Sequence, residues 1–435
     1  MIAPLAADFT EGVLWQDQAP ADPDPEPAAP LPPQVDALVV GAGYAGVSAA
    51  RELAAAGREV LVVDAHPVGW GASTRNGGMV IPELKAGPTA LGEALGPLGP
   101  RLYAEVNEAF DHVESLVAGP DPEIACDYER TGQLYLAHAA RLVPALREVA
   151  REHGDELGEP VRFVESDALA AEVGSRAYHG GVVFERTGGL HPARFHRGLV
   201  ARARQAGARV VGDVRVSGVG RTGSRPGFLV ATTAGDVAAA DVVVCTNAYA
   251  DAAVPALARR VLPVGSFIIA TEVLHPGLAR AVIPKRRMLV DTKNFLYYWR
   301  LTPDGRMLFG GRRSLARTSV AAARDFLHRA MVRVHPQLDG VRVARAWGGD
   351  VAVTLDRLPH VGTVGGAWYV TGCNGSGVAL NTWLGMRVGR HLVGDGPAPG
   401  FAQLPHRPIP LHRLRRAYLP AVGLWFRWQD RGFRP

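Results

Sequence analysis

The stretch that decides the fold is residues 37–64, which read ALVVGAGYAGVSAARELAAAGREVLVVD. The apolar runs 37–40 and 60–63 predict two buried strands, and the segment between them predicts an amphipathic helix that ends at Gly57. Together these elements make a β-α-β unit. The sequence therefore predicts an α/β fold that contains a Rossmann-like, nucleotide-binding domain.

The turn between the first strand and the helix has the pattern Gly-x-Gly-x-x-Gly. Gly41 permits the tight turn, Gly43 lets the backbone approach a pyrophosphate, and Gly46 lets the helix lie close to the strand. The helix N-terminus offers unpaired N–H groups and a positive dipole end to the phosphates. Asp64, at the end of the second strand, can accept hydrogen bonds from ribose hydroxyls. These features fall in register and predict a dinucleotide site; the alternative is a glycine-rich turn without a ligand.

Two later loops bear on which dinucleotide is bound. Residues 69–78 read GWGASTRNGG; their small side chains permit close approach to a flat ring, and Arg75 can address a phosphate. The turn at 375–377 opens another helix, whose N-terminus could face the N1–O2 edge of an isoalloxazine ring. Either loop alone could be an ordinary turn, but their co-occurrence with the first motif favours FAD over NAD.

The distribution of charge argues against nucleic acid as a partner. The chain of 435 residues has a formal net charge of +5. Residues 401–435 hold seven arginines and one acid, a charge of +6, so the other 400 residues sum to about −1. The basic excess is thus confined to a C-terminal tail, and we expect no nucleic-acid partner.

The cysteines and the apolar runs indicate a cellular compartment. Cys126, Cys245 and Cys373 are far apart and form no Cys-x-x-Cys pair, which predicts neither a disulfide framework nor a metal site. No uncharged apolar run reaches membrane-spanning length, and the first residues lack the basic region of a signal peptide. We therefore expect a cytoplasmic protein without a transmembrane segment.

The chain resembles the D-amino-acid-oxidase/glycine-oxidase superfamily of FAD-dependent oxidoreductases in six motifs. They are GAGYAG (41–46), GWGASTRNGG (69–78), GGLHP (188–192), TNAY (246–249), DRLPHVG (356–362) and GCNGSG (372–377). Within this superfamily it is most similar to the gamma-glutamylputrescine oxidoreductases. That branch is matched by the arm around Trp15, by YYWRLT (297–302) and by LPH (404–406).

The resemblance implies a discontinuous FAD-binding domain, like that of glutathione reductase, and a mixed-sheet α+β substrate domain. The expected FAD-binding domain collects residues 35–90, 155–260 and 336–395, and the substrate domain collects residues 91–154 and 261–335. An extended, proline-rich arm (1–34) precedes them and a basic tail (396–435) follows. A separate sheet is expected over 262–311 from its alternating strands.

The glycine motifs and the resemblance together give the expected FAD contacts. In the first motif, the second strand and the following loop these are Gly41, Gly43, Tyr44, Ala45, Gly46, Asp64, Ala65, Gly71, Ala72, Ser73, Arg75, Asn76, Gly77 and Gly78. By position in the family, Val216 would meet the adenine, and Thr246, Asn247 and Ala248 would lie near the pyrophosphate. The late turn, with Gly372, Gly375, Ser376, Gly377 and Val378, would lie along the flavin pyrimidine edge.

The chain departs from the family pattern in three respects. The second-strand acid is more often Glu, so the shorter Asp64 is expected to make a weaker or water-bridged ribose contact. Covalent branches attach FAD through a Cys near 304 or a His in the 73–78 loop; Asp304 and Arg75 occupy those places, so we expect non-covalent FAD. Sarcosine-oxidase relatives hold the substrate carboxylate with a Lys where Ala379 stands, which argues against a small N-methyl amino acid.

The implied reaction is oxidation of a C–H bond next to an amine, at a CH–NH or CH–NH2 group. Hydride passes from that carbon to flavin N5, and water hydrolyses the resulting imine to a carbonyl and a free amine. The cofactor carries the hard step, so no protein nucleophile is required. The expected substrate is a small amine, with a gamma-glutamylputrescine-like molecule favoured, and the expected electron acceptor is O2, which gives H2O2.

Candidate substrate contacts lie on an aromatic strand. By alternation, Tyr297 and Trp299 share one face and Tyr298 and Arg300 share the other. Arg300 could clamp a carboxylate bidentately. Lys293 could lie near flavin N5, where a lysine promotes oxygen reactivity in some relatives. The alternatives are a surface arginine and a solvated turn lysine, and no catalytic residue is assigned.

Three functional classes remain open at this point. The first is an FAD-dependent amine oxidase, the second a membrane-associated FAD dehydrogenase that passes electrons to a quinone or carrier, and the third a flavoprotein tailoring oxidase of a biosynthetic pathway. The basic tail, with its aromatic cluster at 425–428, is the feature that points to the membrane-associated dehydrogenase. Pro420, Gly423 and Arg427 interrupt the aromatic residues of the tail and leave a poor continuous amphipathic face, so we expect the tail to pack on the body rather than bind lipid.

Overall fold

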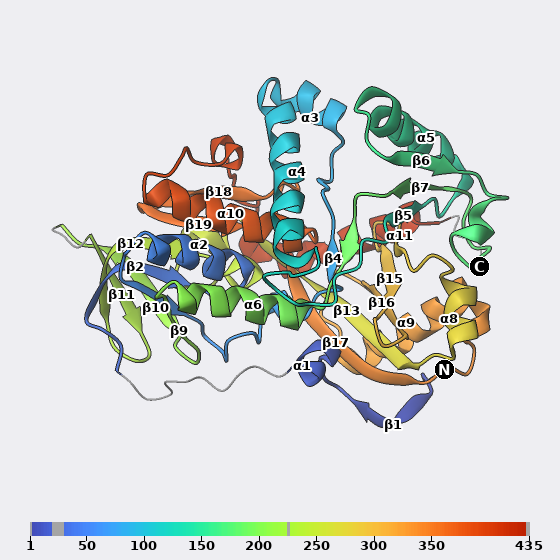
Figure 1. Cartoon of the computed structure of the whole chain (residues 1–435), viewed down its shortest axis with the longest axis horizontal. Coiled ribbons are helices and arrows are strands. Elements are labelled where there is room, and N and C mark those ends of the chain that lie inside the picture. Colours follow the sequence, from blue (N-terminus) through green and yellow to red (C-terminus); the bar gives the residue numbers. More distant parts are fainter. Residues whose placement is uncertain (1, 20–29, 224–226, 432–435) are drawn as a thin grey trace.

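The computed structural model describes residues 2–19, 30–223 and 227–431. Within these ranges two large sheets lie side by side, the one with the β-α-β unit on the left of Figure 1 and a nine-stranded sheet on the right. The fold class is the expected one, an α/β unit joined to a second, mixed-sheet part. No helix of the described residues is both long and apolar enough to cross a membrane.

The first sheet is built around the predicted β-α-β unit. β2 (Gln34–Val40) and β3 (Val60–Val63) pair in parallel and are joined by α2 (Tyr44–Ala55). The sheet continues from β3 to β9 (Arg209–Val211) and from β2 to β12 (Val237–Val244). Its other strands are β10 (Val216–Arg221), β11 (Phe228–Thr232), β18 (His360–Val364) and β19 (Ala367–Thr371).

The strands of the β-α-β unit are buried on both faces. Val39 and Val62 pack into one core, which includes residues of α2. Their neighbours Leu38 and Leu61 pack into a second core together with Phe228 of β11. Alternate side chains of a strand point to opposite faces, so a strand covered on both faces reads as a continuous apolar run.

Helices α2 and α10 (Gly377–Leu392) touch through their backbones. A Cβ added at Gly385 would lie 2.0 Å from the carbonyl oxygen of Ala45, and one at Gly389 would lie 2.7 Å from that of Ala49. Both contacts advance in the same direction, so the helices run parallel. In this register α10 begins about seven residues before the level at which α2 begins, an offset of roughly 10 Å along the helix axes. The two glycines thereby set the spacing between two helix N-termini.

The nine-stranded sheet has the order β1-β17-β13-β16-β15-β14-β5-β7-β6. The strands expected over 262–311 are present as β13 (Leu262–Val273), β14 (Met288–Asp291), β15 (Tyr297–Leu301) and β16 (Arg306–Gly311). The others are β1 (Leu5–Thr10), β5 (Gln133–Leu136), β6 (Val161–Val164), β7 (Gly181–Phe184) and β17 (Val343–Val353). Tyr297 and Trp299 pack on one face with Leu327 of α9 (Val320–Val334).

The remaining elements cover the sheets and connect them. The helices are α1 (Leu14–Gln18), α3 (Pro88–Leu95), α4 (Leu98–Val117), α5 (Val143–Arg151), α6 (Pro192–Gln205), α7 (Pro255–Ala258), α8 (Pro276–Val282) and α11 (Arg415–Gln429). A short ribbon pairs β4 (Met79–Val80) with β8 (Gly188–Gly189). It places the end of the 69–78 loop beside the GGLHP segment.

Three strands belong to a different sheet than expected. β6 and β7 fall in the segment 155–260, and β17 falls in 336–395, both expected for the FAD-binding domain, yet all three pair within the nine-stranded sheet. A local pattern predicts a strand, but its sheet is chosen by distant partners, which are β5 for β7 and β13 for β17.

The described part of the N-terminal arm packs on the body as a strand and a short helix. β1 pairs in parallel with β17, and α1 buries Trp15, whose indole N–H donates to the Asn76 carbonyl oxygen at 2.9 Å. Within the arm expected to be extended over 1–34, β1 is an extended strand and α1 is a short helix, and an open sheet edge and an aromatic anchor hold them on the body. Residues 20–29, which hold half of the prolines of the arm, lie outside the described residues.

The C-terminal tail contains a helix that the sequence did not predict. α11 runs through Pro420 without a break. The Asp430 carboxylate accepts hydrogen bonds from the backbone N–H groups of Asn294 and Phe295, at 2.8 and 3.0 Å, and fastens the helix to the body. The tail thus packs on the body as expected.

Candidate active site

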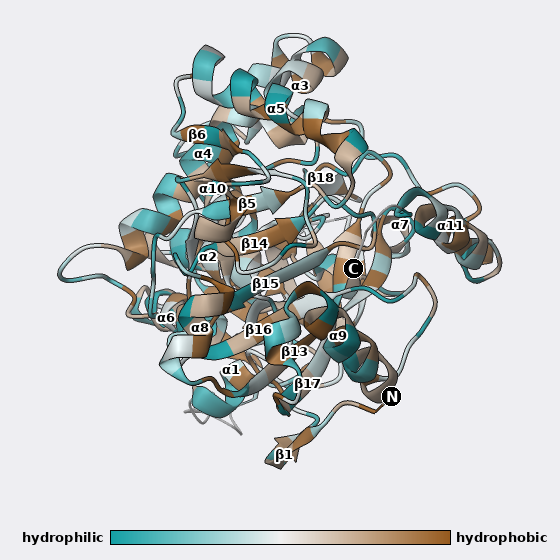
Figure 2. Cartoon of the chain, turned by 90° about the vertical axis from the view of Figure 1, so that its right-hand side faces the viewer, coloured by the Kyte–Doolittle hydropathy of each residue, from teal (hydrophilic) through white to brown (hydrophobic). Residues whose placement is uncertain are grey.

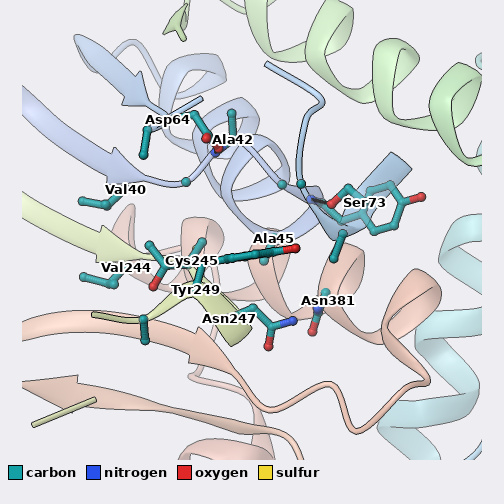
Figure 3. Close-up of a pocket in the computed structure, with 18 of the residues that line it drawn as sticks. Val40, Ala42, Ala45, Asp64, Ser73, Val244, Cys245, Asn247, Tyr249 and Asn381 are labelled. Atoms are coloured by element: carbon teal, nitrogen blue, oxygen red, sulfur yellow. Dashed lines mark hydrogen bonds between the residues drawn. The ribbon is translucent and has the colours of Figure 1, made fainter. Parts of the chain in front are cut away.

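A pocket lies where the carboxyl ends of β2, β3 and β12 meet the N-termini of α2 and α10 (Figure 3). Most of the expected FAD contacts line it. They are Gly41, Gly43, Tyr44, Ala45, Asp64, Ala65, Gly71, Ala72, Ser73, Asn76, Val216, Thr246, Asn247, Gly375, Gly377 and Val378. The fold therefore gathers at one cavity motifs that are more than 300 residues apart in the sequence.

Two glycines make the first turn possible. Gly41 has a φ of +103°, and a Cβ there would lie 2.9 Å from the carbonyl oxygen of Cys245. A Cβ at Gly46 would lie 1.9 Å from the carbonyl oxygen of Gly41. No side chain fits at either position, so the turn is narrow and presents bare backbone to the pocket.

Asp64 is fixed by the turn that it faces. Its Oδ2 accepts a hydrogen bond from the Ala42 N–H at 2.8 Å, and its Oδ1 accepts one from the His66 N–H at 3.1 Å. A carboxylate has about four lone-pair sites. Two of these are used by the backbone, which leaves acceptor capacity on a side chain that lines the pocket.

The 69–78 loop is tied both to itself and to α2. The Ser73 hydroxyl accepts a hydrogen bond from the Tyr44 N–H at 3.1 Å. The Asn76 amide donates to the carbonyl oxygens of Ala72 and Ser73, and its Oδ1 accepts from the Gly78 N–H at 2.8 Å. The loop therefore lines the pocket as a rigid wall.

The wall at the start of α10 holds an unsatisfied acceptor. The side chains of Asn247 and Asn381 point toward one another in Figure 3. Asn247 accepts a hydrogen bond from the Gly372 N–H at 3.0 Å, whereas the Asn381 Oδ1 is buried and has no hydrogen-bond partner among the described residues. A buried acceptor of this kind is costly unless a ligand donates to it.

These features fit FAD. The bare glycine turn and the N-terminus of α2 suit a pyrophosphate, the remaining lone pairs of Asp64 suit a ribose, and the side chain of Val216 suits a flat adenine ring. The N-terminus of α10 and the Asn381 Oδ1 suit the polar edge of an isoalloxazine ring. The offset of roughly 10 Å along the helix axes separates the part of the pocket that suits an anion from the part that suits a ring.

Some expected contacts support the pocket without lining it. Arg75 donates to the carbonyl oxygens of Trp70 and Gly348, at 2.6 and 3.1 Å, and lies over the Trp70 ring, so it ties the loop to β17 instead of reaching a phosphate. Burial lowers the pKa of its guanidinium. The others that are absent from the lining are Gly46, Gly77, Gly78, Ala248, Gly372 and Ser376.

Some lining residues, among them His66 and His196, lie outside the six sequence motifs. His196 on α6 lies behind the first turn, with its Nε2 2.6 Å from the Ala42 carbonyl oxygen. The carbonyl can only accept, so Nε2 carries the proton, and burial lowers the pKa of this imidazole. Trp70, stacked on His66, and Tyr249 form an aromatic corner at the same pocket. Trp70 and Tyr249 belong to the motifs at 69–78 and 246–249, but their contact with each other depends on packing between distant elements.

Arg300 does not face the pocket. It is 2% exposed, and its guanidinium donates to the carbonyl oxygens of Gly77 and Leu190 at 2.8 and 2.6 Å. It also lies over the Trp15 ring, and burial lowers its pKa to about 10. The two interpretations from the sequence, a carboxylate clamp and a surface arginine, are both wrong, because Arg300 is neither open to a substrate nor on the surface. It instead joins the 69–78 loop to the nine-stranded sheet.

Lys293 is also buried, so the alternative of a solvated turn lysine is wrong. Its Nζ lies 2.7 Å from the Asp291 Oδ2 and 3.4 Å from the centre of the Tyr297 ring. Burial lowers the pKa of the lysine and raises that of the aspartic acid. The ammonium packs on Tyr297, whose ring joins the α9 side of the sheet, so the structure does not bring it to the pocket.

Tyr298 lies on the opposite face of its strand from Tyr297, as predicted. Its ring is 3.2 Å from the position of a Cβ at Gly77, and its hydroxyl is 3.1 Å from the Ser266 Oγ. Gly310, its partner on β16, leaves room for the ring. Tyr298 therefore stands between the nine-stranded sheet and the 69–78 loop.

Comparison with known proteins agrees with this geometry. Residues 36–390 match the DAO family, described as FAD dependent oxidoreductase. The gamma-glutamylputrescine oxidoreductase of Escherichia coli (strain K12) is 32% identical over 393 residues, which are 89% of this chain and 91% of that protein. A probable oxidoreductase, OrdL, of Rhizobium meliloti (strain 1021) is 29% identical over 433 residues, 97% of this chain and 98% of that protein.

The fold likeness extends to solved structures. Glycine oxidase from Geobacillus kaustophilus superposes with a TM-score of 0.71 at 20% identity, covering 86% of this chain and 100% of that one. At this identity the likeness concerns the fold alone. The family match covers most of the chain and includes the pocket, so this chain belongs to the DAO family of FAD-dependent oxidoreductases.

Proposed function

We propose that the protein uses non-covalently bound FAD to oxidise the carbon next to the nitrogen of an amine that also carries a carboxylate. A gamma-glutamylputrescine-like molecule is the favoured substrate, and O2 is the acceptor that yields H2O2. The substrate class rests on the 32% identity with the gamma-glutamylputrescine oxidoreductase of Escherichia coli. The environment of Arg312 is the observation that supports a carboxylate on the substrate.

Arg312 follows directly on the last residue of β16. Gly310 pairs with Tyr298 and lies beneath its ring, so by alternation Arg312 belongs to the same side of the sheet. Burial lowers the pKa of the Arg312 guanidinium, and the nearby Tyr298 and Cys373 oppose that shift. Cys373 itself lines the pocket at the late glycine turn. Arg312 is therefore near both Tyr298 and Cys373.

The Arg312 side chain has no hydrogen-bond acceptor or ion-pair partner among the described residues. A desolvated guanidinium is strongly favoured to bind an anion, and a carboxylate matches its two-pronged geometry. In this respect Arg312 takes the role that the sequence suggested for Arg300, whose donors are already used by carbonyl groups.

When bound, FAD supplies the hydride acceptor. The protein's part is to bind the neutral amine, to align its C–H bond and to exclude bulk water. Arg312 would hold the remote carboxylate, Tyr298 would form the apolar wall against which the carbon chain lies, and Asn381 would orient the cofactor ring through its unsatisfied oxygen.

The experiment compares gamma-glutamylputrescine with its analogue that lacks the carboxylate, in a peroxide-coupled assay. Losing a charge-assisted hydrogen bond costs about 1.5–3 kcal/mol, so Arg312→Ala should raise the KM for the carboxylated amine roughly tenfold to a hundredfold. The KM for the analogue should barely change, because only remote binding is lost. Arg312→Lys should rescue partly, since a point charge cannot reproduce the two-pronged contact.

The adjacent, exposed Arg313 provides the matched control. Arg313→Ala should leave both KM values unchanged, and all variants should retain wild-type FAD content. An equal rise in KM for both amines would make Arg312 a structural residue. If neither amine reduces the flavin without oxygen, the proposed substrate class is wrong.

The acceptor is tested separately. Under air, about one H2O2 should form for each amine oxidised. Little peroxide, together with rapid turnover when a quinone or dye is added, would instead support a dehydrogenase.

A further inference from the structure

The segment 312–319, which joins β16 to α9, has no regular secondary structure, and we call it the 312–319 loop. Its own hydrogen bonds are few. The Ser314 hydroxyl donates to the Ala316 carbonyl oxygen at 3.1 Å, and the Thr318 hydroxyl donates to the same oxygen at 3.4 Å. A segment bonded so sparsely takes its conformation from what packs against it.

Two arginines of the loop lie close to the pocket wall. Arg312 is near Tyr298 and Cys373, and Cys373 lines the pocket. Arg317 is near Asp350, another lining residue, and opposes the rise in the pKa of the Asp350 carboxyl that burial causes. The conformation of the loop therefore decides where two guanidinium groups stand beside the pocket.

The C-terminal helix α11, at the right-hand margin of Figure 2, contacts the loop at two points. Gly423 is buried, and a Cβ added there would lie 3.9 Å from the backbone nitrogen of Leu315. The Arg427 guanidinium donates a hydrogen bond to the Arg313 carbonyl oxygen at 3.1 Å. Residues four apart lie on the same side of a helix, so both contacts come from one face of α11.

A cavity of about 500 Å³ adjoins these two contacts. The loop residues 313–319 line it on one side, and α11 lines it on the other with Pro420, Gly423, Leu424 and Arg427. The helix therefore supports the loop at points rather than along its length. The loop has room to move when one of the contacts is lost.

The helix itself is fixed to the body by bonds that do not involve the loop. The Asp430 carboxylate accepts hydrogen bonds from the backbone N–H groups of the 294–295 turn. Arg141 donates to the carbonyl oxygens of Gln429 and Arg431, at 2.5 and 2.9 Å. The end of α11 that carries Arg427 is thus anchored, and the loop leans on a support that is held elsewhere.

We propose that α11 positions Arg312 for the substrate by holding the 312–319 loop, with Gly423 and Arg427 as the positioning residues. The inference rests on the proposed function, in which Arg312 binds the substrate carboxylate. A guanidinium on a loop that is already held loses little conformational freedom when it binds. If the loop is released, the substrate must order it, and the cost falls on the carboxylate contact alone.

Hydrogen–deuterium exchange of the holoenzyme, followed by mass spectrometry without substrate, tests whether α11 holds the loop. Arg427→Ala should speed exchange of the 312–319 amides roughly twofold to tenfold, the factor expected for one ordinary hydrogen bond. Gly423→Leu should have at least this effect, because its Cβ would already touch Leu315 and the rest of the side chain would displace the loop. Gly423→Ala adds only that Cβ, at ordinary contact distance, and should change exchange much less.

Arg416→Ala is the matched control. Arg416 is an exposed arginine of the same helix, and its side chain has no hydrogen bond or ion pair with any residue that the structure describes. Its variant should exchange as the wild type does, and all variants should keep the wild-type FAD content.

Peroxide-coupled kinetics test the link from α11 to Arg312. Arg427→Ala should raise the KM for the carboxylated amine roughly twofold to tenfold and leave the KM for the analogue without the carboxylate unchanged. In an Arg312→Ala background the Arg427 substitution should have no further effect on either KM, because it acts through Arg312.

The proposal is overturned if neither Arg427→Ala nor Gly423→Leu speeds exchange in the loop. It is also overturned if exchange rises in Arg427→Ala but the two KM values change equally or not at all. Failure of the proposed function has a different signature: Arg312→Ala would then leave the ratio of the two KM values as in the wild type, whereas the exchange measurement, which uses no substrate, would still show whether α11 holds the loop.

Discussion

Removing the carboxylate of Asp64 should weaken FAD binding more than any comparable change outside the pocket. The carboxylate accepts N–H groups from Ala42 and His66, at 2.8 and 3.1 Å, and has free lone pairs toward the pocket. Losing one charge-assisted hydrogen bond to the ribose costs about 1.5–3 kcal/mol, or roughly tenfold to a hundredfold in affinity. Because Asp64→Ala also releases the amide of the glycine turn, we expect a loss at the upper end of that range.

The affinity is measured by titrating FAD into deflavinated protein and following the change in flavin fluorescence. Asp36→Ala is the matched control, since the Asp36 Oδ2 also accepts a backbone N–H, that of Glu59 at 2.8 Å, at the opposite end of β2. Asp213→Ala would be a poorer control for Asp64→Ala, because the φ of +58° at Asp213 adds backbone strain to an alanine substitution. Equal FAD affinity in the Asp64 and Asp36 variants would refute the assignment of Asp64 to the ribose.

Three further outcomes are expected. Acid precipitation should release the yellow colour into the supernatant, and flavin that stays with the pellet would contradict non-covalent binding. Arg300→Lys should lower the melting temperature and the FAD content, because one ammonium cannot reach the carbonyl oxygens of both Gly77 and Leu190; wild-type values for both would argue against a fastening role. Burial lowers the pKa of the fully buried His335 to about 4, below the ordinary 6.5, so the unfolded chain binds a proton first as the pH falls. The contribution of His335 to the free energy of unfolding is complete above pH 6.5 and declines by about 3 kcal/mol toward pH 4. The free energy of unfolding in urea should therefore depend less on pH in His335→Gln than in the wild type.

The amino-acid sequence by itself determined the elements whose information is local. The strand-turn-helix-strand unit over 37–64 follows from apolar runs and glycine spacing within one short segment, and the structure confirms it as β2, α2 and β3. The strands over 262–311 and the helix at the late glycine turn were predicted on the same grounds. Many of the expected FAD contacts line the pocket because glycine turns at helix starts carry their geometry with them.

Only the tertiary structure decided which charged side chains have hydrogen-bond partners within the protein. Arg300 lies on β15 and Arg312 directly follows the neighbouring strand β16. Carbonyl groups from two distant loops occupy Arg300, whereas no described residue pairs with Arg312. The spacing of the two helix N-termini likewise depends on Gly385 packing against Ala45, a contact across 340 residues. A local pattern specifies which side of its own element a residue occupies. What packs against that side is set by long-range packing, which is why the roles of the arginines emerged only in three dimensions.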